Sequence, residues 1–358
     1  MKFQITVPGK LLILGEYAVL EGSPALVVAV NRHCTVTVTT RSSATLILQA
    51  VNLDLPELSL LRDDDNRYVL EEDPSYNTNY SNYRYCIEAI RIFQRNFPEH
   101  VLPSATISVD TSEFYHHTDN AKIGLGSSAA VTIATLRALF ELTNTQYNPP
   151  KFFSMALKAH RAAQEGKGSG VDIAASIYGG LLQYIKPTSD SETVHPIESI
   201  PLPDNLFIIP VWTGYSVSTR EFVGRVKRAQ SDSPEAYQLI MRSLHDLASL
   251  GIENLQGGRI NYFLEIVQEY GNVMGQLGQL ADIDILSKVH REIREFVEQS
   301  GGVYKPSGAG GGDIGIAITT TPEMRQRIIE SLGKKSYTVL DLTINQKGVN
   351  IRNYTKHK

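Results

Sequence analysis

The stretch that decides the fold is KIGLGSSAAVTIATLRALF, residues 122–140. Gly124 and Gly126 let the backbone curl so that several N–H groups face one point. The small and apolar residues after Ser127 predict a helix over residues 127–142, and the positive end of that helix lies at the same point. Loop and helix together predict an anion site that suits a phosphate group.

Three polar side chains of this stretch add to the predicted site. The hydroxyls of Ser127 and Ser128 can cap the helix or ligate Mg²⁺, and Lys122 places a positive charge at the loop entrance. An ordinary tight turn with a serine N-cap is the simpler interpretation. Both interpretations stay open on the residues alone.

The residues around the loop exclude some kinds of phosphate-binding site. It is not a Walker A loop, because no Gly-Lys-Ser/Thr follows. Gly124, Gly126 and Ala129 match G-x-G-x-x-A, but a dinucleotide site expects a strand that runs directly into the first glycine. Here the predicted strand ends near Asp110, and the expected acidic residue after a second strand is missing. An NAD-dependent oxidoreductase is therefore a distant competitor.

Two other segments carry candidate catalytic residues. EGKGSGVDIAASIYGG, residues 165–180, places Asp172 at the start of a short helix. There the carboxylate can complement the helix dipole or act as a general base for a substrate hydroxyl. PGKLLILGEYAVLEG, residues 8–22, places Lys10 in an apolar strand, on a solvated edge or beside a polar partner. Beside Asp172, Lys10 would lower the pKa of that carboxylate and neutralise a transferring phosphoryl group.

A second glycine cluster lies near the C-terminus, in KPSGAGGGDIGIAI, residues 305–318. A plain turn rarely needs three consecutive glycines. They permit close approach of the backbone to a ligand or to the first loop.

Hydrophobic periodicity predicts strands and helices without regular βαβ alternation, which favours the α+β class. Pro8 and Gly9 predict a turn. The polar residues 187–199 predict a boundary between an N-terminal domain, 1–190, and a C-terminal domain, 200–358. The predicted strands are 3–7, 10–14, 25–30, 34–40, 45–53, 105–110, 181–185, 206–211, 314–319 and 337–342. The predicted helices are 81–97, 127–142, 151–164, a short one near Asp172, 233–250, 258–278, 283–299 and 322–332.

Composition excludes several classes of protein. The 358 residues include 34 basic and 38 acidic side chains, for a net charge of −4, which argues against a nucleic-acid partner. No apolar run approaches the ~20 residues of a membrane helix, and Lys10 interrupts any signal-peptide core. The two cysteines cannot form a disulfide framework. We therefore expect a reduced, cytoplasmic location and no membrane partner.

The four motifs, in this order, resemble the superfamily of galactokinase, homoserine kinase, mevalonate kinase and phosphomevalonate kinase, the GHMP kinases. PGKLLILGEYAVLEG resembles the first family motif, GLGSSAA (124–130) the ATP phosphate loop, and SGAGGGD (307–313) the third motif. The match spans nearly the whole chain. It implies an α+β GHMP kinase fold, with an N-terminal ATP-binding domain of ribosomal-protein-S5-like character and a ferredoxin-like C-terminal domain.

Within the superfamily, the details resemble the phosphomevalonate kinase branch. Mevalonate kinases typically carry histidine at the Tyr17 position, proline and glycine near the Lys122 position, and a fourth glycine at the Asp313 position. WTGYSVSTREFV, residues 212–223, also resembles that branch. The resemblance implies ATP-dependent phosphorylation of phosphomevalonate to diphosphomevalonate in the mevalonate route to isoprenoids. The alternatives are a mevalonate kinase or another GHMP kinase acting on a hydroxyl, and a catalytically silent ligand-binding relative.

The resemblance also implies residue roles, with ATP and Mg²⁺ as cofactors and a small molecule as partner. Asp172 would be the base or orienting carboxylate, and Lys10 its partner. The ATP phosphates would be held by Lys122, Gly124, Leu125, Gly126, Ser127, Ser128 and Ala129, and Mg²⁺ by Ser128 and Glu165. The acceptor would be lined by Tyr17, Ser169, Ser216, Ser218, Thr219, Lys305 and Ser307. The adjacent histidines 116 and 117 are interpreted as exposed loop residues, not as a metal site.

Overall fold

Two long antiparallel strands, β1 (Lys2–Leu14) and β2 (Pro24–Thr40), organise the first sheet. The structure is a computed structural model, and it describes residues 1–70, 78–117, 121–166, 168–187 and 197–353. Apolar side chains run along both strands, and nearly all of them are buried. This strand pair is thus the part of the sheet that positions the N-terminal motifs.

The first sheet contains nine strands among the described residues, in the order β13-β1-β2-β6-β3-β4-β5, with β7 beside β2 and β8 beside β7. β3 runs parallel to β6, and the other pairs are antiparallel. The bounds are β3 (Leu46–Ala50), β4 (Leu58–Arg62), β5 (Tyr68–Val69), β6 (Ala105–Asp110), β7 (Leu181–Ile185), β8 (Glu198–Ile200) and β13 (Asn350–Asn353).

The predicted turn at Pro8 and Gly9 is wrong. β1 continues through both residues, with a shift of register against β2 between them. Pairing with the longer strand overrides the local turn preference, and the irregularity becomes a β-bulge. A side chain on Gly9 would lie 2.9 Å from the Leu125 carbonyl oxygen, so the bulge brings β1 against the phosphate loop. The predicted break between 25–30 and 34–40 is likewise absent, because β2 is continuous.

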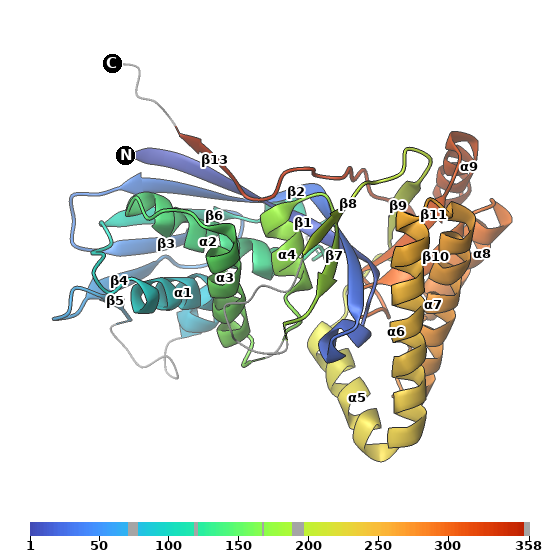
Figure 1. Ribbon diagram of the computed structural model, residues 1–358. Coiled ribbons are helices and arrows are strands. Elements are labelled where there is room, and N and C mark those ends of the chain that lie inside the picture. Colours follow the sequence, from blue (N-terminus) through green and yellow to red (C-terminus); the bar gives the residue numbers. More distant parts are fainter. Residues whose placement is uncertain (71–77, 118–120, 167, 188–196, 354–358) are drawn as a thin grey trace.

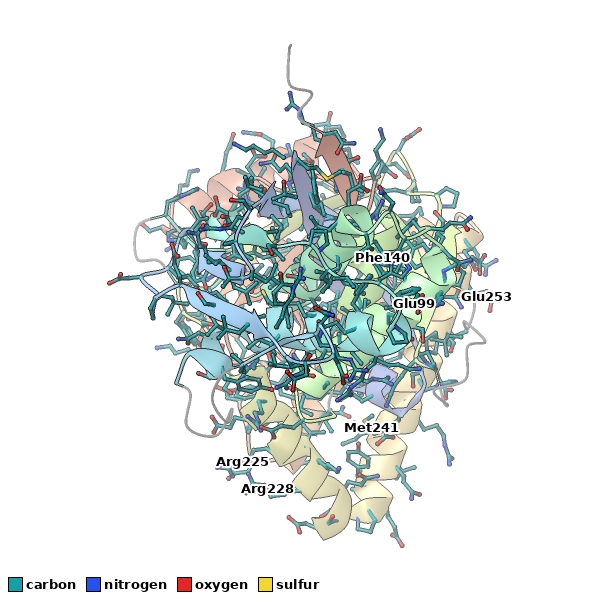
Figure 2. The ribbon with its side chains drawn as sticks, turned by 90° about the vertical axis from the view of Figure 1, so that its left-hand side faces the viewer. Glu99, Phe140, Arg225, Arg228, Met241 and Glu253 are labelled. Atoms are coloured by element: carbon teal, nitrogen blue, oxygen red, sulfur yellow. The ribbon has the colours of Figure 1, made fainter. Side chains whose placement is uncertain are left out.

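Four helices accompany the first sheet: α1 (Thr78–Asn96), α2 (Ser127–Leu142), α3 (Pro149–Ala163) and α4 (Val171–Tyr178). Figure 1 shows them gathered beside its strands. α2 is buried along most of its length and packs against β1, β2 and the other three helices. Phe140 of α2 lies inside this layer (Figure 2), with its ring centroid 5.5 Å from that of Phe93 and 5.3 Å from that of Phe152.

The C-terminal part forms a second sheet in the order β10-β11-β9-β12. Its strands are β9 (Phe207–Trp212), β10 (Val303–Ser307), β11 (Ile314–Thr319) and β12 (Thr338–Val339). The helices are α5 (Thr219–Asp232), α6 (Pro234–Gln256), α7 (Ile260–Leu280), α8 (Lys288–Gln299) and α9 (Pro322–Gly333). The long α6 and α7 lie side by side (Figure 1). Among the described residues, no helix combines the length and apolar character needed to cross a bilayer.

The end of the chain returns to the first sheet. β13 pairs with β1, with Phe3 opposite Asn353, and the Asn345 N–H donates to the Ala29 carbonyl. The domain boundary at 190–200 stays a prediction. The C-terminal tail was expected in the C-terminal domain, 200–358, but its strand β13 belongs to the N-terminal sheet. The strands β4, β5, β8, β10 and β13 and the helix α5 were not among the predicted elements.

Candidate active site

The phosphate loop has the backbone that its glycines predict. Gly124 and Gly126 adopt φ of 88° and 83°, the left-handed region that favours glycine. Gly126 is the N-cap of α2, and no side chain caps the helix there. The serine N-cap interpretation is therefore wrong. The first turn of α2 keeps its N–H groups available for an anion.

The structure brings Lys10 and Asp172 to this loop. A side chain on Gly126 would lie 3.3 Å from Lys10 Cγ and 3.6 Å from Asp172 Cβ. The Lys10 N–H donates to the Leu125 carbonyl at 2.9 Å, and its Nζ lies 3.5 Å from the Gly124 carbonyl. The aliphatic parts of Lys10 and Asp172, from distant segments, thus lie against one glycine of the loop, although the two charged groups do not form an ion pair with each other.

The β-bulge explains why these two segments lie together. Asp172 is in the first turn of α4, where its carboxylate accepts from the Ile173 N–H at 3.1 Å. Ser176, further along α4, donates its hydroxyl to the Pro8 carbonyl at 2.7 Å. α4 is therefore fastened to β1 at the bulge, two residues before Lys10.

Ser128 contacts a histidine that belongs to none of the sequence motifs. Its Oγ lies 3.2 Å from Nε2 of His160 on α3, a side chain only 2% exposed. Burial lowers the pKa of His160, and the charge of Asp172 opposes that shift. Ser128, His160 and Asp172 thus lie near one another.

The third motif reaches the loop through Asp313. A side chain on Gly124 would lie 2.9 Å from Asp313 Cβ, and the Ser216 hydroxyl donates to Asp313 Oδ1 at 2.7 Å. Burial raises the pKa of Asp313, an effect opposed by the Ser216 hydrogen bond and by the charges of Lys10 and Lys122. The expected approach of the second glycine cluster to the first loop is therefore present. The signal in the sequence was the run of three glycines, and Asp313 itself was not among the predicted site residues.

Three other predicted residues lie where the two parts of the chain join. Lys305 is fully buried, with Nζ 2.5 Å from Glu16 Oε1. Ser307 donates to the Leu12 carbonyl at 2.8 Å, and Tyr17 donates to the Ala309 carbonyl at 2.5 Å. Lys305 was predicted to line the acceptor site, but its ammonium group is buried and paired with Glu16, so it presents no free charge to an acceptor.

The remaining predicted residues lie at the start of α5 and in the segment before α4. Ser218 is its exposed N-cap and Thr219 its first residue. Glu165 is exposed and forms an ion pair with Arg220. Ser169, whose Oγ accepts from the Val171 N–H at 3.3 Å, lies in the loop before α4. Their substrate and metal roles stay predictions.

Two sequence features lie outside this site. Figure 2 shows Arg225 and Arg228 close together on α5, and Arg225 forms an ion pair with Asp282 at 3.9 Å. His116 is not simply exposed, since its ring stacks on Trp212 with centroids 4.1 Å apart. Lys167, a further lysine of the glycine segments, lies outside the described residues.

The polar side chains of the site can bind Mg²⁺ that is also coordinated by nucleotide phosphates. They do not form a metal site made of protein ligands alone. Within the described ranges, no group of three or more His, Cys, Asp or Glu side chains could hold a metal. Mg²⁺ that binds phosphates needs only one or two protein oxygens. The Ser128 hydroxyl, in contact with the buried His160, can supply one of them.

Comparison with known proteins shows which family this chain is similar to. The family model for the N-terminal domain of GHMP kinases matches residues 84–180, and the model for their C-terminal domain matches residues 252–338. The chain is 31% identical to the phosphomevalonate kinase of Streptomyces sp. strain CL190, over 87% of this chain and 88% of that protein. It is 25% identical to the mevalonate kinase of Thermococcus sibiricus, over 98% of each chain.

A solved structure agrees with the fold. Streptococcus pneumoniae phosphomevalonate kinase, in complex with phosphomevalonate and AMPPNP, superimposes with a TM-score of 0.78 at 19% identity. The similarity covers 95% of this chain and 99% of that one. The expected mixed fold with two characteristic domains is thereby confirmed.

Proposed function

The chain belongs to the GHMP kinase superfamily of phosphotransferases, and from this premise we propose that it phosphorylates phosphomevalonate with ATP. The products are ADP and diphosphomevalonate, on the mevalonate route to isoprenoids. The observation that carries the proposal is the meeting of Lys10 and Asp172 at Gly126 of the phosphate loop. The choice of acceptor is supported by the 31% identity to the Streptomyces enzyme.

The reaction exchanges one phosphorus–oxygen bond for another. The bond from the γ-phosphorus to the β–γ bridging oxygen of ATP breaks, and a phosphate oxygen of the acceptor bonds to the same phosphorus. A phosphate monoester has a second pKa near 6, so the acceptor oxygen is largely ionised at pH 7. Asp172 is then needed less as a base than as the carboxylate that orients Lys10 and the acceptor.

The loop residues hold the donor. N–H groups around Gly124 and Gly126 and the N-terminus of α2 face the ATP phosphates, and Lys10 and Lys122 add positive charge. Ser128 is the residue that would hold Mg²⁺, which neutralises phosphate charge when bound, and Glu165 stays the predicted second ligand. A chain of net charge −4 attracts anionic substrates only through such local groups. A cytoplasmic location remains part of the proposal.

A mevalonate kinase is the second candidate. It is favoured by the 25% identity to the Thermococcus enzyme, which extends over 98% of this chain. The two activities differ in the acceptor: a phosphate in one case, a hydroxyl in the other. A hydroxyl acceptor must lose a proton, which would give Asp172 the role of general base.

An assay of ADP release with each acceptor decides between them. We expect kcat/KM for phosphomevalonate to exceed that for mevalonate by at least ~100-fold, which corresponds to ~2.7 kcal/mol of transition-state binding. Neutralising Lys122 should reduce this preference as well as the rate. Mevalonate as the better acceptor would overturn the phosphomevalonate assignment. ADP release with neither would favour a silent ligand-binding relative.

A further inference from the structure

His160 is a buried, chemically capable side chain to which the proposed reaction gives no role. It lies on α3, and its ring stacks on Tyr85 with centroids 5.6 Å apart. The ring edge toward α2 meets the Ser128 hydroxyl, with 3.2 Å between Nε2 and Oγ. The other nitrogen, Nδ1, is buried and has no hydrogen-bond partner among the described residues. Within the described residues, the hydrogen-bond partner of the ring is thus the Ser128 hydroxyl at the start of α2.

The direction of the hydrogen bond between His160 and Ser128 follows from the surroundings of the ring. An imidazole carries a proton on at least one of its two nitrogens, and a buried N–H group needs an acceptor. Since Nδ1 faces no acceptor among the described residues, the proton belongs on Nε2, which donates to Ser128 Oγ. The serine oxygen then accepts on one side, which leaves its other lone pair and its own proton for groups away from the ring.

We propose that His160 is a positioning residue that holds the Ser128 hydroxyl in the orientation needed to bind the magnesium–nucleotide. The inference rests on the proposed function only in that the chain binds ATP with Mg²⁺. It does not depend on which acceptor is used. A serine side chain without a partner samples several staggered values of χ1. A hydrogen bond from a rigid, stacked ring selects one of these rotamers.

The test measures nucleotide binding without any acceptor. AMPPNP is titrated calorimetrically into the full-length protein, with Mg²⁺ and again with EDTA. We expect His160→Phe, which keeps an aromatic ring beside Tyr85 but has no nitrogen, to weaken binding of Mg²⁺–AMPPNP about tenfold, or ~1.4 kcal/mol. His160→Gln places an amide near the Nε2 position and should stay within about threefold of the wild type. With EDTA, the three proteins should bind AMPPNP alike.

A double-mutant cycle separates positioning from packing. In a Ser128→Ala background, His160→Phe should cause no further loss, because the hydroxyl that it positions is already absent. A matched control is His245→Phe on α6, which removes a similar contact of 3.0 Å between His245 Nδ1 and Ser23 Oγ. That variant should bind Mg²⁺–AMPPNP as the wild type does.

Three results would overturn the inference. They are wild-type affinity of His160→Phe, an equal loss in the Ser128→Ala background, and a loss with EDTA as large as the loss with Mg²⁺. If His160→Phe does not fold, His160→Asn replaces it, since the shorter amide cannot reach Ser128 Oγ. Equal affinities of the Asn and Gln variants would then contradict the proposal. None of these results bears on the acceptor, whose identity is decided by ADP release.

Discussion

At the scale of single residues, the candidate site is assembled on two glycines of the phosphate loop, because Lys10 and Asp172 lie against Gly126 and Asp313 lies against Gly124. The sequence marked Lys10 and Asp172 through their glycine-bearing segments, although it left a purely structural interpretation open for each. His160 could not be found in this way, because a histidine on a half-apolar helix has many structural explanations. Its contact with Ser128 depends on how α3 packs against α2, which no local pattern encodes.

The role of Asp172 is testable by Asp172→Asn. The amide keeps the shape and can still accept from the Ile173 N–H, but it no longer balances the charge of Lys10. We expect kcat to fall about 10²–10⁴-fold, while the affinity for Mg²⁺–AMPPNP changes much less. Steady-state kinetics and calorimetry measure the two quantities. Asp282→Asn, at a highly exposed surface carboxylate, is the control. Turnover at the wild-type level would remove Asp172 from the site.

At the scale of elements, prediction succeeded where the apolar residues follow a clear pattern, either a long apolar run or strict alternation. The bounds of α2, β6, β7 and β11 coincide with the predicted ranges 127–142, 105–110, 181–185 and 314–319. It failed where pairing partners decide the outcome. Pro8 and Gly9 form a bulge because β2 continues opposite them, and β5 and β8 are too short to show a period. Lys305 was expected in a cleft, whereas β10 places it inside the protein.

The ion pair between Glu16 and Lys305 predicts strong dependence of stability on both partners. Both side chains are almost completely buried, and burial lowers the pKa of Lys305 while Glu16 opposes that shift. Lys305→Met leaves Glu16 as an uncompensated buried charge, so the free energy of unfolding should fall by about 3–5 kcal/mol.

The double variant Glu16→Gln/Lys305→Met removes both charges and should recover much of that loss. Urea unfolding followed by circular dichroism measures each protein. If the single variant loses less than about 1 kcal/mol, the buried pair is not what holds β10 to the segment after β1.

At the scale of the whole molecule, the order of the motifs predicted the family and its mixed fold, which the comparisons bear out. The return of β13 to β1 was not predictable, because a strand of four residues gains its stability from the sheet edge that it completes. The same tail fastens α4, since the Asn345 carbonyl accepts from the N–H of Gly180, just after that helix. Distant ends of the chain therefore support the site together.

The stability of the whole protein should fall at mildly acidic pH, because His290 is buried in a neutral form. Its Nδ1 lies 2.8 Å from the Tyr304 hydroxyl and its Nε2 lies 3.2 Å from the Gly312 carbonyl. Burial lowers its pKa to about 4, whereas an unfolded histidine titrates near 6.5. Above pH 6.5 both states are neutral and the residue adds no pH dependence.

Between pH 6.5 and about 4 the unfolded chain binds a proton that the folded chain does not, so the free energy of unfolding declines as the pH falls. By pH 4 the loss from this residue should approach about 3 kcal/mol, at ~1.4 kcal/mol per pH unit. Urea unfolding at pH 7.5, 6 and 5 measures the slope, and carboxylates contribute equally to wild type and variant. His290→Gln should therefore be less stable at pH 7.5 but show a flatter decline. Parallel declines of the two proteins would mean that His290 is protonated in the folded state.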